Sequence, residues 1–150
     1  MTLEEIAKKM CAPGKGILAA DESTGTMDKR LTSVGVECTY KNRLHFRETL
    51  FTSDAIKKFI GGVILYDVTI REKTSKGISI PKLLEENNSI VGIKVDKGTK
   101  KLAGSPEETI TDGLDGLRER LSEYYKLGAR FTKWRAVYNI GKNYPSVQSI

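Results

Sequence analysis

The stretch Gly16-Ile17-Leu18-Ala19-Ala20-Asp21-Glu22-Ser23 places a short apolar run directly before an acidic and hydroxylated end. A continuous run of this kind, without alternating polar residues, predicts a β-strand that is buried on both faces. Asp21 marks the point at which the strand meets a polar environment. Three later segments show the same pattern of a largely apolar run that ends in ionisable residues. They are Gly62–Tyr66 before Asp67, Ile90–Asp96, and Ala129–Arg135.

Helices are expected between these strands. Thr2 and Glu5 have the spacing of a capping box, which predicts a first helix that ends before Pro13 and Gly14. Apolar spacing and end signals predict four more helices, through 29–31 with an end near Gly35, over 39–51, over 80–86, and over 111–127 with Gly128 as its C-cap. The segments around 71–76 and 98–106 are interpreted as loops.

Alternating strands and helices, with no hairpin signal such as Asn-Gly, predict right-handed crossovers and a parallel sheet, so the fold class is α/β. A doubly wound open sheet and a segment of a TIM (β/α)₈ barrel both fit. A dinucleotide-binding sheet carries Gly-x-Gly-x-x-Gly after its first strand, whereas Gly14-Lys15-Gly16 precedes the strand here. Ionisable residues at the carboxyl ends of all four strands favour the barrel family, here about its first four β/α units.

Composition excludes several classes of protein. The 150 residues are 29% charged and 39% hydrophobic, which is typical of one soluble globular unit. No segment approaches the roughly 18 consecutive apolar residues of a membrane span, and the start is not that of a signal peptide, so a cytoplasmic protein without membrane contact is expected. Cys11, Cys38 and His45, the only residues of their types, disfavour a disulfide framework and metal catalysis, and no cofactor is expected.

The net charge of +6 is spread along the chain without a long basic run, so a nucleic-acid partner is not expected and phosphorylated small molecules fit better. Parallel strands would gather Asp21, Lys94, Asp96, Lys133 and Arg135 around one opening. Cations there can hold phosphate oxygens, while a carboxylate accepts hydrogen bonds from sugar hydroxyls. Structural alternatives remain, because Asp21 also suits a helix N-cap and the other four also suit structural ion pairs.

A second anion-binding element is expected after the first strand. Ser23 and Thr26 lie in a turn that leads into a helix, where hydroxyls and backbone amides can bind an anion, and Arg30 follows one helical turn later.

Taken together, these segments resemble the class I fructose-bisphosphate aldolases, the metal-free, Schiff-base-forming enzymes of glycolysis. The resemblance covers essentially the whole chain and is carried by 14–26, 29–31, 48–52, 61–65, 92–98, 113–117 and 133–135. It implies a (β/α)₈ barrel, a homotetramer, and reversible cleavage of fructose 1,6-bisphosphate to dihydroxyacetone phosphate and glyceraldehyde 3-phosphate.

The resemblance also implies residue roles. Asp21 matches the aspartate that contacts substrate hydroxyls and helps to govern carbon–carbon cleavage. Lys94 matches a substrate-contacting lysine, and Lys133 the lysine beside the imine that assists proton transfer. Arg135 aligns with a basic residue associated with phosphate binding. The phosphate-side turn of the family aligns with Ser23, Thr26 and Arg30.

Two departures from the family accompany these matches. Asp67-Val68-Thr69-Ile70-Arg71 stands where the family has a His-Glu or Glu-Glu pair and then Thr-Leu-Tyr, so the carboxylate is lost at Val68. A barrel takes about 250 residues, and in the family the imine-forming lysine and the glutamate acid/base lie on later strands. Residues 1–150 are therefore expected to be the N-terminal portion of a barrel whose C-terminal half is absent, and to be inactive alone.

Two other hypotheses stay open. A truncated or non-catalytic aldolase-like protein would bind sugar phosphates without cleaving them. A basic nucleic-acid-binding module would show salt-sensitive affinity for polynucleotides and indifference to sugar phosphates. The second is less favoured because the cations lie at strand ends.

Overall fold

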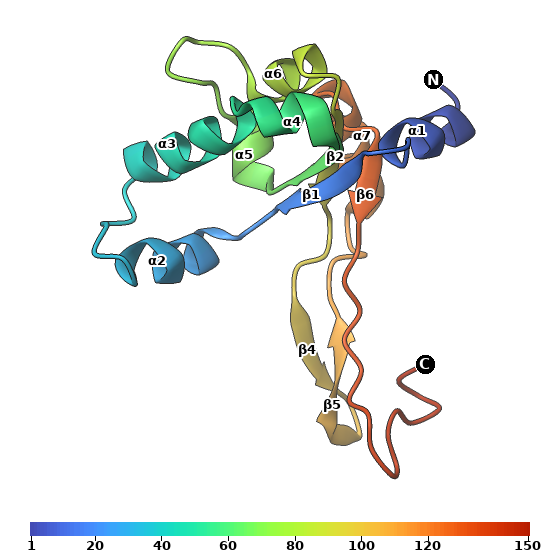
Figure 1. Cartoon of the computed structure of the whole chain (residues 1–150). Helices are drawn as coiled ribbons and strands as arrows, with labels where there is room; N and C mark the ends of the chain where they lie inside the picture. Colours follow the sequence, from blue (N-terminus) through green and yellow to red (C-terminus); the bar gives the residue numbers. More distant parts are fainter.

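A four-stranded parallel sheet organises the computed structural model, which describes residues Met1–Ile150 (Figure 1). Its strand order is β1-β2-β3-β6, with β1 over Gly16–Ala20, β2 over Ile60–Leu65, β3 over Ile90–Lys94 and β6 over Phe131–Lys133. All three pairings are parallel. The predicted α/β class and the four predicted strands are confirmed. The sheet is open, because β1 and β6 each pair on one side only.

Seven helices connect or flank these strands. They are α1 (Leu3–Met10), α2 (Thr24–Thr32), α3 (Tyr40–Phe51), α4 (Asp54–Phe59), α5 (Asp67–Arg71), α6 (Ile80–Glu86) and α7 (Leu117–Lys126). The predicted capping box of α1 is confirmed, since the Thr2 hydroxyl accepts from the Glu5 amide and the Glu5 carboxylate accepts from the Thr2 amide. Sequence periodicity missed α4 and α5, because helices of six and five residues are too short to show it.

The predicted loop around 98–106 was wrong. An antiparallel hairpin stands there, formed by β4 (Thr99–Leu102) and β5 (Ser105–Thr111). The two strands are joined by Ala103 and Gly104, and Gly104 has a φ of 79°, which a glycine adopts without strain. Figure 1 shows this hairpin extending away from the sheet beside the C-terminal segment.

Helix α7 begins later than the sequence predicted. Its expected start at Thr111 was wrong because Thr111 is the last residue of β5. Gly113 and Gly116 then take φ values of 128° and 64°, outside the right-handed helical region. The chain turns there before the helix starts, so Leu114 lies outside α7 and is 70% exposed.

The hydrophobic core lies between one face of the sheet and the helices. Alternate strand residues, among them Val63, Leu65, Val91 and Ile93, are buried in a cluster that also contains Phe51, Ile56, Ile80, Leu84 and Tyr124. Figure 1 shows α3 and α4 on this side of β1 and β2. Because side chains alternate along a strand, the residues between these core positions face the other side. The pleat thereby sends Asp21, Lys94 and Lys133 to the face opposite the core cluster.

Glycine is required on that second face at β3. Gly92 pairs with Phe131 of β6, and a Cβ atom on Gly92 would clash with three atoms of the Phe131 ring. The ring therefore occupies the space that a side chain at Gly92 would need. Close approach of a neighbouring group is one of the reasons for glycine inside a strand.

Glu72, at the end of α5, is buried and gives a pH-dependent prediction. Burial raises its pKa, and the charges of Arg43 and Arg47 offset only part of that effect. The folded state thus binds the proton more tightly than the unfolded state, so this contribution to stability is present at low pH and is lost as the pH rises through the folded pKa. We expect Glu72→Gln to raise the urea midpoint at pH 7, with a difference that shrinks as the pH falls toward about 4.

The exposed Glu85 on α6 provides the control for this variant, because Glu85→Gln removes the same negative charge without a buried site. Equal midpoints for Glu72→Gln and Glu85→Gln at pH 7 would contradict the prediction.

Candidate active site

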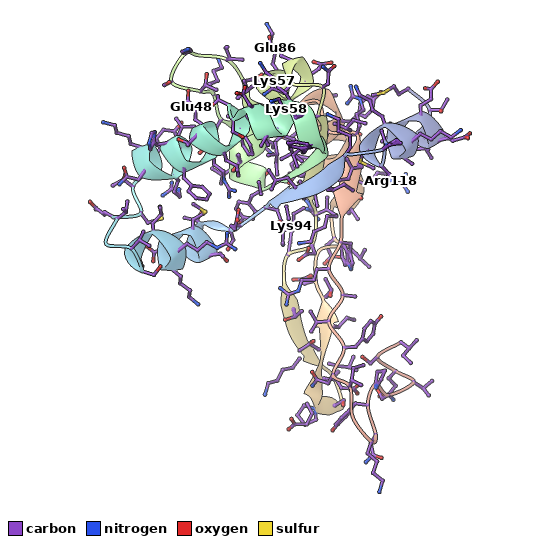
Figure 2. All side chains as sticks on the ribbon, viewed as in Figure 1. Glu48, Lys57, Lys58, Glu86, Lys94 and Arg118 are labelled. Atoms are coloured by element: carbon purple, nitrogen blue, oxygen red, sulfur yellow. The ribbon has the colours of Figure 1, made fainter.

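A cavity of about 820 Å³ lies at the carboxyl ends of the parallel strands. All eight residues that the sequence predicted around this opening line it: Asp21, Ser23, Thr26, Arg30, Lys94, Asp96, Lys133 and Arg135. Figure 2 shows Lys94 where the sheet meets the hairpin. Cationic side chains outnumber carboxylates in the lining, with Arg30, Arg71, Lys94, Lys97, Arg120, Lys133 and Arg135 against Asp21, Glu22, Asp67, Asp96 and Glu123. The lining is suited to anions.

An ion pair in the cavity lining joins the residue after β1 to β6. The Lys133 Nζ donates to Asp21 Oδ2 at 2.6 Å, although the residues lie 112 positions apart. The Asp21 side chain is 11% exposed and that of Lys133 is 32% exposed, so the ammonium is the more accessible partner. Asp21 is not the N-cap of α2, which was its structural alternative, because Ser23 takes that position.

A second ion pair forms within a single strand end. The Lys94 Nζ donates to Asp96 Oδ1 and to the Asp96 carbonyl oxygen, both at 2.7 Å. Burial by itself would raise the pKa of Asp96, but the Lys94 ammonium and the amides of Gly98 and Arg135 outweigh it, so the pKa of Asp96 is lowered. Lys94 and Asp96 thus form an ion pair of the kind that the sequence left open as their structural alternative.

The turn after β1 is tightly organised. The Ser23 hydroxyl accepts from the Thr26 amide at 3.3 Å and lies 3.2 Å from the Thr26 hydroxyl. Glu22 forms ion pairs with both Arg30 and Arg47. The Arg30 side chain is 58% exposed at the cavity, whereas that of Arg47 is 3% exposed behind the turn. Arg47 was not predicted, because nothing in the sequence of its helix distinguishes it from a solvated arginine.

The segment Asp67–Arg71 after β2, which departs from the family pattern, lines another side of the cavity. Arg71 forms ion pairs with Asp67 and with Glu123 of α7, and these two carboxylates raise the pKa of Arg71. The Tyr124 hydroxyl donates to Asp67 Oδ1 at 2.9 Å. Burial, followed by that hydrogen bond, raises the pKa of Tyr124. Asp67 and Arg71 therefore belong to the cavity lining, while Val68 is exposed outside it.

Two more cations of the lining were not predicted. Arg120 of α7 donates to the carbonyl oxygens of Val95 and Gly113, so its guanidinium braces the end of β3. Lys97 follows Asp96 directly, and its position beside a predicted site residue could have indicated it. Lys97, Arg120 and Arg135 form no ion pair, which leaves three cations of the cavity lining without a carboxylate partner.

No group of three or more His, Cys, Asp and Glu side chains is placed to hold a metal ion. None of the helices has the length and apolar character needed to cross a lipid bilayer.

Comparison with known proteins identifies what this arrangement resembles. The profile of the glycolytic family described as "Fructose-bisphosphate aldolase class-I" matches residues 2–150. A Xanthomonas campestris protein named "Probable fructose-bisphosphate aldolase class 1" is 56% identical over 144 residues, which cover 96% of this chain and 43% of that protein. The "Fructose-bisphosphate aldolase, cytoplasmic isozyme 1" of Pisum sativum is 55% identical, over 96% of this chain and 40% of that protein.

The similarity extends to three dimensions. A solved structure of fructose-bisphosphate aldolase from Plasmodium falciparum, in complex with TRAP and a small-molecule inhibitor, superposes with a TM-score of 0.92 at 46% sequence identity. The match covers 97% of this chain and 42% of that one. The chain thus spans about two fifths of the length of the relatives that it matches.

Proposed function

The chain belongs to the class I fructose-bisphosphate aldolase family, and on that premise we propose that its cavity binds fructose 1,6-bisphosphate in a metal-independent, Schiff-base aldolase of glycolysis. The reaction is the reversible cleavage of this sugar to dihydroxyacetone phosphate and glyceraldehyde 3-phosphate. The pea relative, named a cytoplasmic isozyme, supports a cytoplasmic location. By resemblance to the family, the whole enzyme is a homotetramer.

The observation that carries the proposal is the Lys133–Asp21 ion pair beside uncompensated cations at one opening. Arg135 has no carboxylate partner, so its guanidinium is free to bind a phosphate group of the sugar. Arg30 and the Ser23–Thr26 turn supply donors for the other phosphate. A bisphosphate substrate needs an anion site at each end, and the lining offers both.

Between these anion sites, the paired groups serve the bond that breaks. Asp21 accepts a hydrogen bond from a substrate hydroxyl, and as a carboxylate it can remove that proton as the carbon–carbon bond cleaves. Lys133 and Lys94 place positive charge where negative charge develops on the substrate oxygens. Preorganised charges of this kind stabilise a transition state without reorganising during the reaction.

We also propose that the four-stranded sheet is the first half of a (β/α)₈ barrel. Its strands are parallel and in chain order, its functional groups lie at the carboxyl ends, and both β1 and β6 keep an unpaired edge. By resemblance, the imine-forming lysine and the glutamate acid/base belong to strands beyond these four. These 150 residues by themselves should therefore bind the substrate without turning it over.

Titration calorimetry of the 150-residue chain with fructose 1,6-bisphosphate tests this proposal. We expect binding that Lys133→Met weakens by about tenfold or more, because losing a hydrogen bond to a charged group costs about 1.5 to 3 kcal/mol. Incubation with the sugar and borohydride should trap no imine.

Lys58→Met is the matched control, because Lys58 is an exposed lysine of α4 outside the cavity and its replacement changes the net charge equally (Figure 2). Failure of the unchanged chain to bind the sugar would refute the proposed function, and equal losses in the two variants would show non-specific attraction. Efficient trapping would show that a lysine among these 150 residues forms the imine. Salt-sensitive binding to polynucleotides, without binding to the sugar, would favour the nucleic-acid hypothesis.

A further inference from the structure

The Asp96 carboxylate accepts hydrogen bonds from three different residues around the cavity. Its Oδ1 accepts from the Lys94 Nζ at 2.7 Å and from the Gly98 amide at 3.2 Å, and its Oδ2 accepts from the Arg135 amide at 3.3 Å. The side chain is 3% exposed. One buried carboxylate thus holds the end of β3, the root of the hairpin and the segment after β6.

The first of these contacts restrains a flexible group. A lysine carries its ammonium on four methylene groups and is mobile when it is free. The Lys94 Nζ is bound by both the carboxylate and the carbonyl oxygen of Asp96, so two oxygens of one residue set its direction. Its side chain remains 18% exposed, which leaves the ammonium accessible from the cavity.

The contact from the Arg135 amide links Asp96 to the segment that follows the neighbouring strand, β6. Lys94 pairs with Lys133 in the sheet register, and the Val95 amide donates to the Lys133 carbonyl oxygen at 3.1 Å. Beyond this point β6 has ended, and the contact from the Arg135 amide to Asp96 continues the link between the two segments. The position of Arg135 relative to Lys94 therefore depends on Asp96.

The surroundings require a carboxylate and not merely a polar group. Lys94, Lys97, Lys133 and Arg135 all line the cavity, and Asp21 already pairs with Lys133. Asp96 is the only carboxylate that forms an ion pair with Lys94. Without it, neighbouring like charges would repel one another and the flexible lysine would move toward solvent.

We propose that Asp96 is a positioning residue of the sugar-phosphate site, which aims the Lys94 ammonium into the cavity and holds Arg135 at the distance that a phosphorylated sugar needs. It does not touch the substrate. The proposal rests on the proposed function for the identity of the ligand. One part of it, the restraint of Lys94 by Asp96, can be measured without any ligand.

The test uses Asp96→Asn in the 150-residue chain, first checked for native circular dichroism. Brief acylation with a limiting amine reagent, followed by digestion and mass spectrometry, measures the reactivity of Lys94 relative to exposed Lys58. We expect the Lys94 rate to rise several-fold, because its ammonium is released from the carboxylate. Calorimetry should show the affinity for fructose 1,6-bisphosphate falling by about tenfold, the loss expected for one charge-assisted contact.

Asp112→Asn is the matched control. Asp112 also accepts from a lysine Nζ, that of Lys100 at 2.7 Å, and from the Gly113 amide at 2.8 Å, but it lies outside the cavity lining. This variant should leave both the Lys94 rate and the sugar affinity unchanged. A role of Asp96 in stability alone would lower the urea midpoint and move neither of these two measurements.

If Asp96→Asn does not fold, Asp96→Glu keeps the charge and shifts the carboxylate by one methylene, and the same two changes are expected. A folded variant with unchanged Lys94 reactivity and unchanged affinity would overturn the proposal. If the unchanged chain fails to bind the sugar while Asp96→Asn still releases Lys94, the proposed function fails and the restraint of Lys94 by Asp96 is upheld.

Discussion

Replacing Arg47 by methionine should lower the free energy of unfolding by about 3 to 5 kcal/mol, the range found when one partner of a buried ion pair is removed. Arg47 is the buried partner of Glu22, and its second guanidinium nitrogen donates to the Glu22 carbonyl oxygen at 3.1 Å. These contacts attach α3 to the turn after β1. Without them the Glu22 carboxylate, which is 12% exposed, keeps only Arg30. Urea denaturation followed by circular dichroism measures the loss.

Arg30→Met is the control, because Arg30 pairs with the same Glu22 carboxylate but is exposed. An exposed ion pair contributes about 0 to 1 kcal/mol, so Arg30→Met should shift the urea midpoint only slightly. It should nevertheless weaken sugar-phosphate binding, since Arg30 lines the cavity. Similar stability losses in the two variants would contradict the assignment of Arg47 as the structural partner of Glu22 and Arg30 as the partner at the cavity.

Gly61→Ala should destabilise the fold by about 1 to 3 kcal/mol or more, the usual cost of adding a methyl group to a filled space. A Cβ atom on Gly61 would overlap the Met10 carbonyl oxygen and lie 2.9 Å from the Met10 carbonyl carbon and 3.0 Å from the Lys9 carbonyl oxygen. These are backbone atoms at the end of α1, so no side chain can rotate away. The added methyl group must push α1 off β2.

Gly25 allows the comparison to be made within the same chain. It lies in α2, and a Cβ atom there would meet nothing within 4 Å. Alanine is favoured over glycine in a helix by roughly 0.5 to 1 kcal/mol, so Gly25→Ala should be neutral or slightly stabilising. Thermal or urea unfolding of both variants measures the contrast. A Gly61→Ala protein as stable as the unchanged chain would mean that α1 does not pack closely against β2.

Local patterns predicted the parts of this fold whose signals lie within a few residues. The four strands were recognisable because each is a continuous apolar run ending in charge, and α1 because Thr2 and Glu5 form a reciprocal cap. The hairpin β4–β5 escaped prediction because its residues are mostly polar and its Ala103-Gly104 turn carries a weak signal. The start of α7 was misplaced because Thr111 pairs with a strand instead of beginning the helix.

Some residues of the candidate site could likewise be predicted from local sequence, and others could not. Asp21, Lys94, Lys133 and Arg135 could be selected from sequence, because parallel strands of one sheet deliver their carboxyl ends to one edge. Arg47, Arg120 and the Asp67–Arg71–Glu123 cluster could not be selected, because each depends on how a helix is placed against the strand ends.

The amino-acid sequence by itself determined the four parallel strands, the five longer helices, the charged groups at the strand ends and the resemblance to an aldolase, since these depend on local pattern and residue identity. Only the tertiary structure decided which charges meet. Lys133 pairs with Asp21 across 112 residues, and Asp96 joins Lys94 to the segment after β6. Such pairs form because the order and register of the strands bring distant residues within hydrogen-bonding distance. Strand order and register depend on how several segments pack together, so no single segment of the sequence determines them.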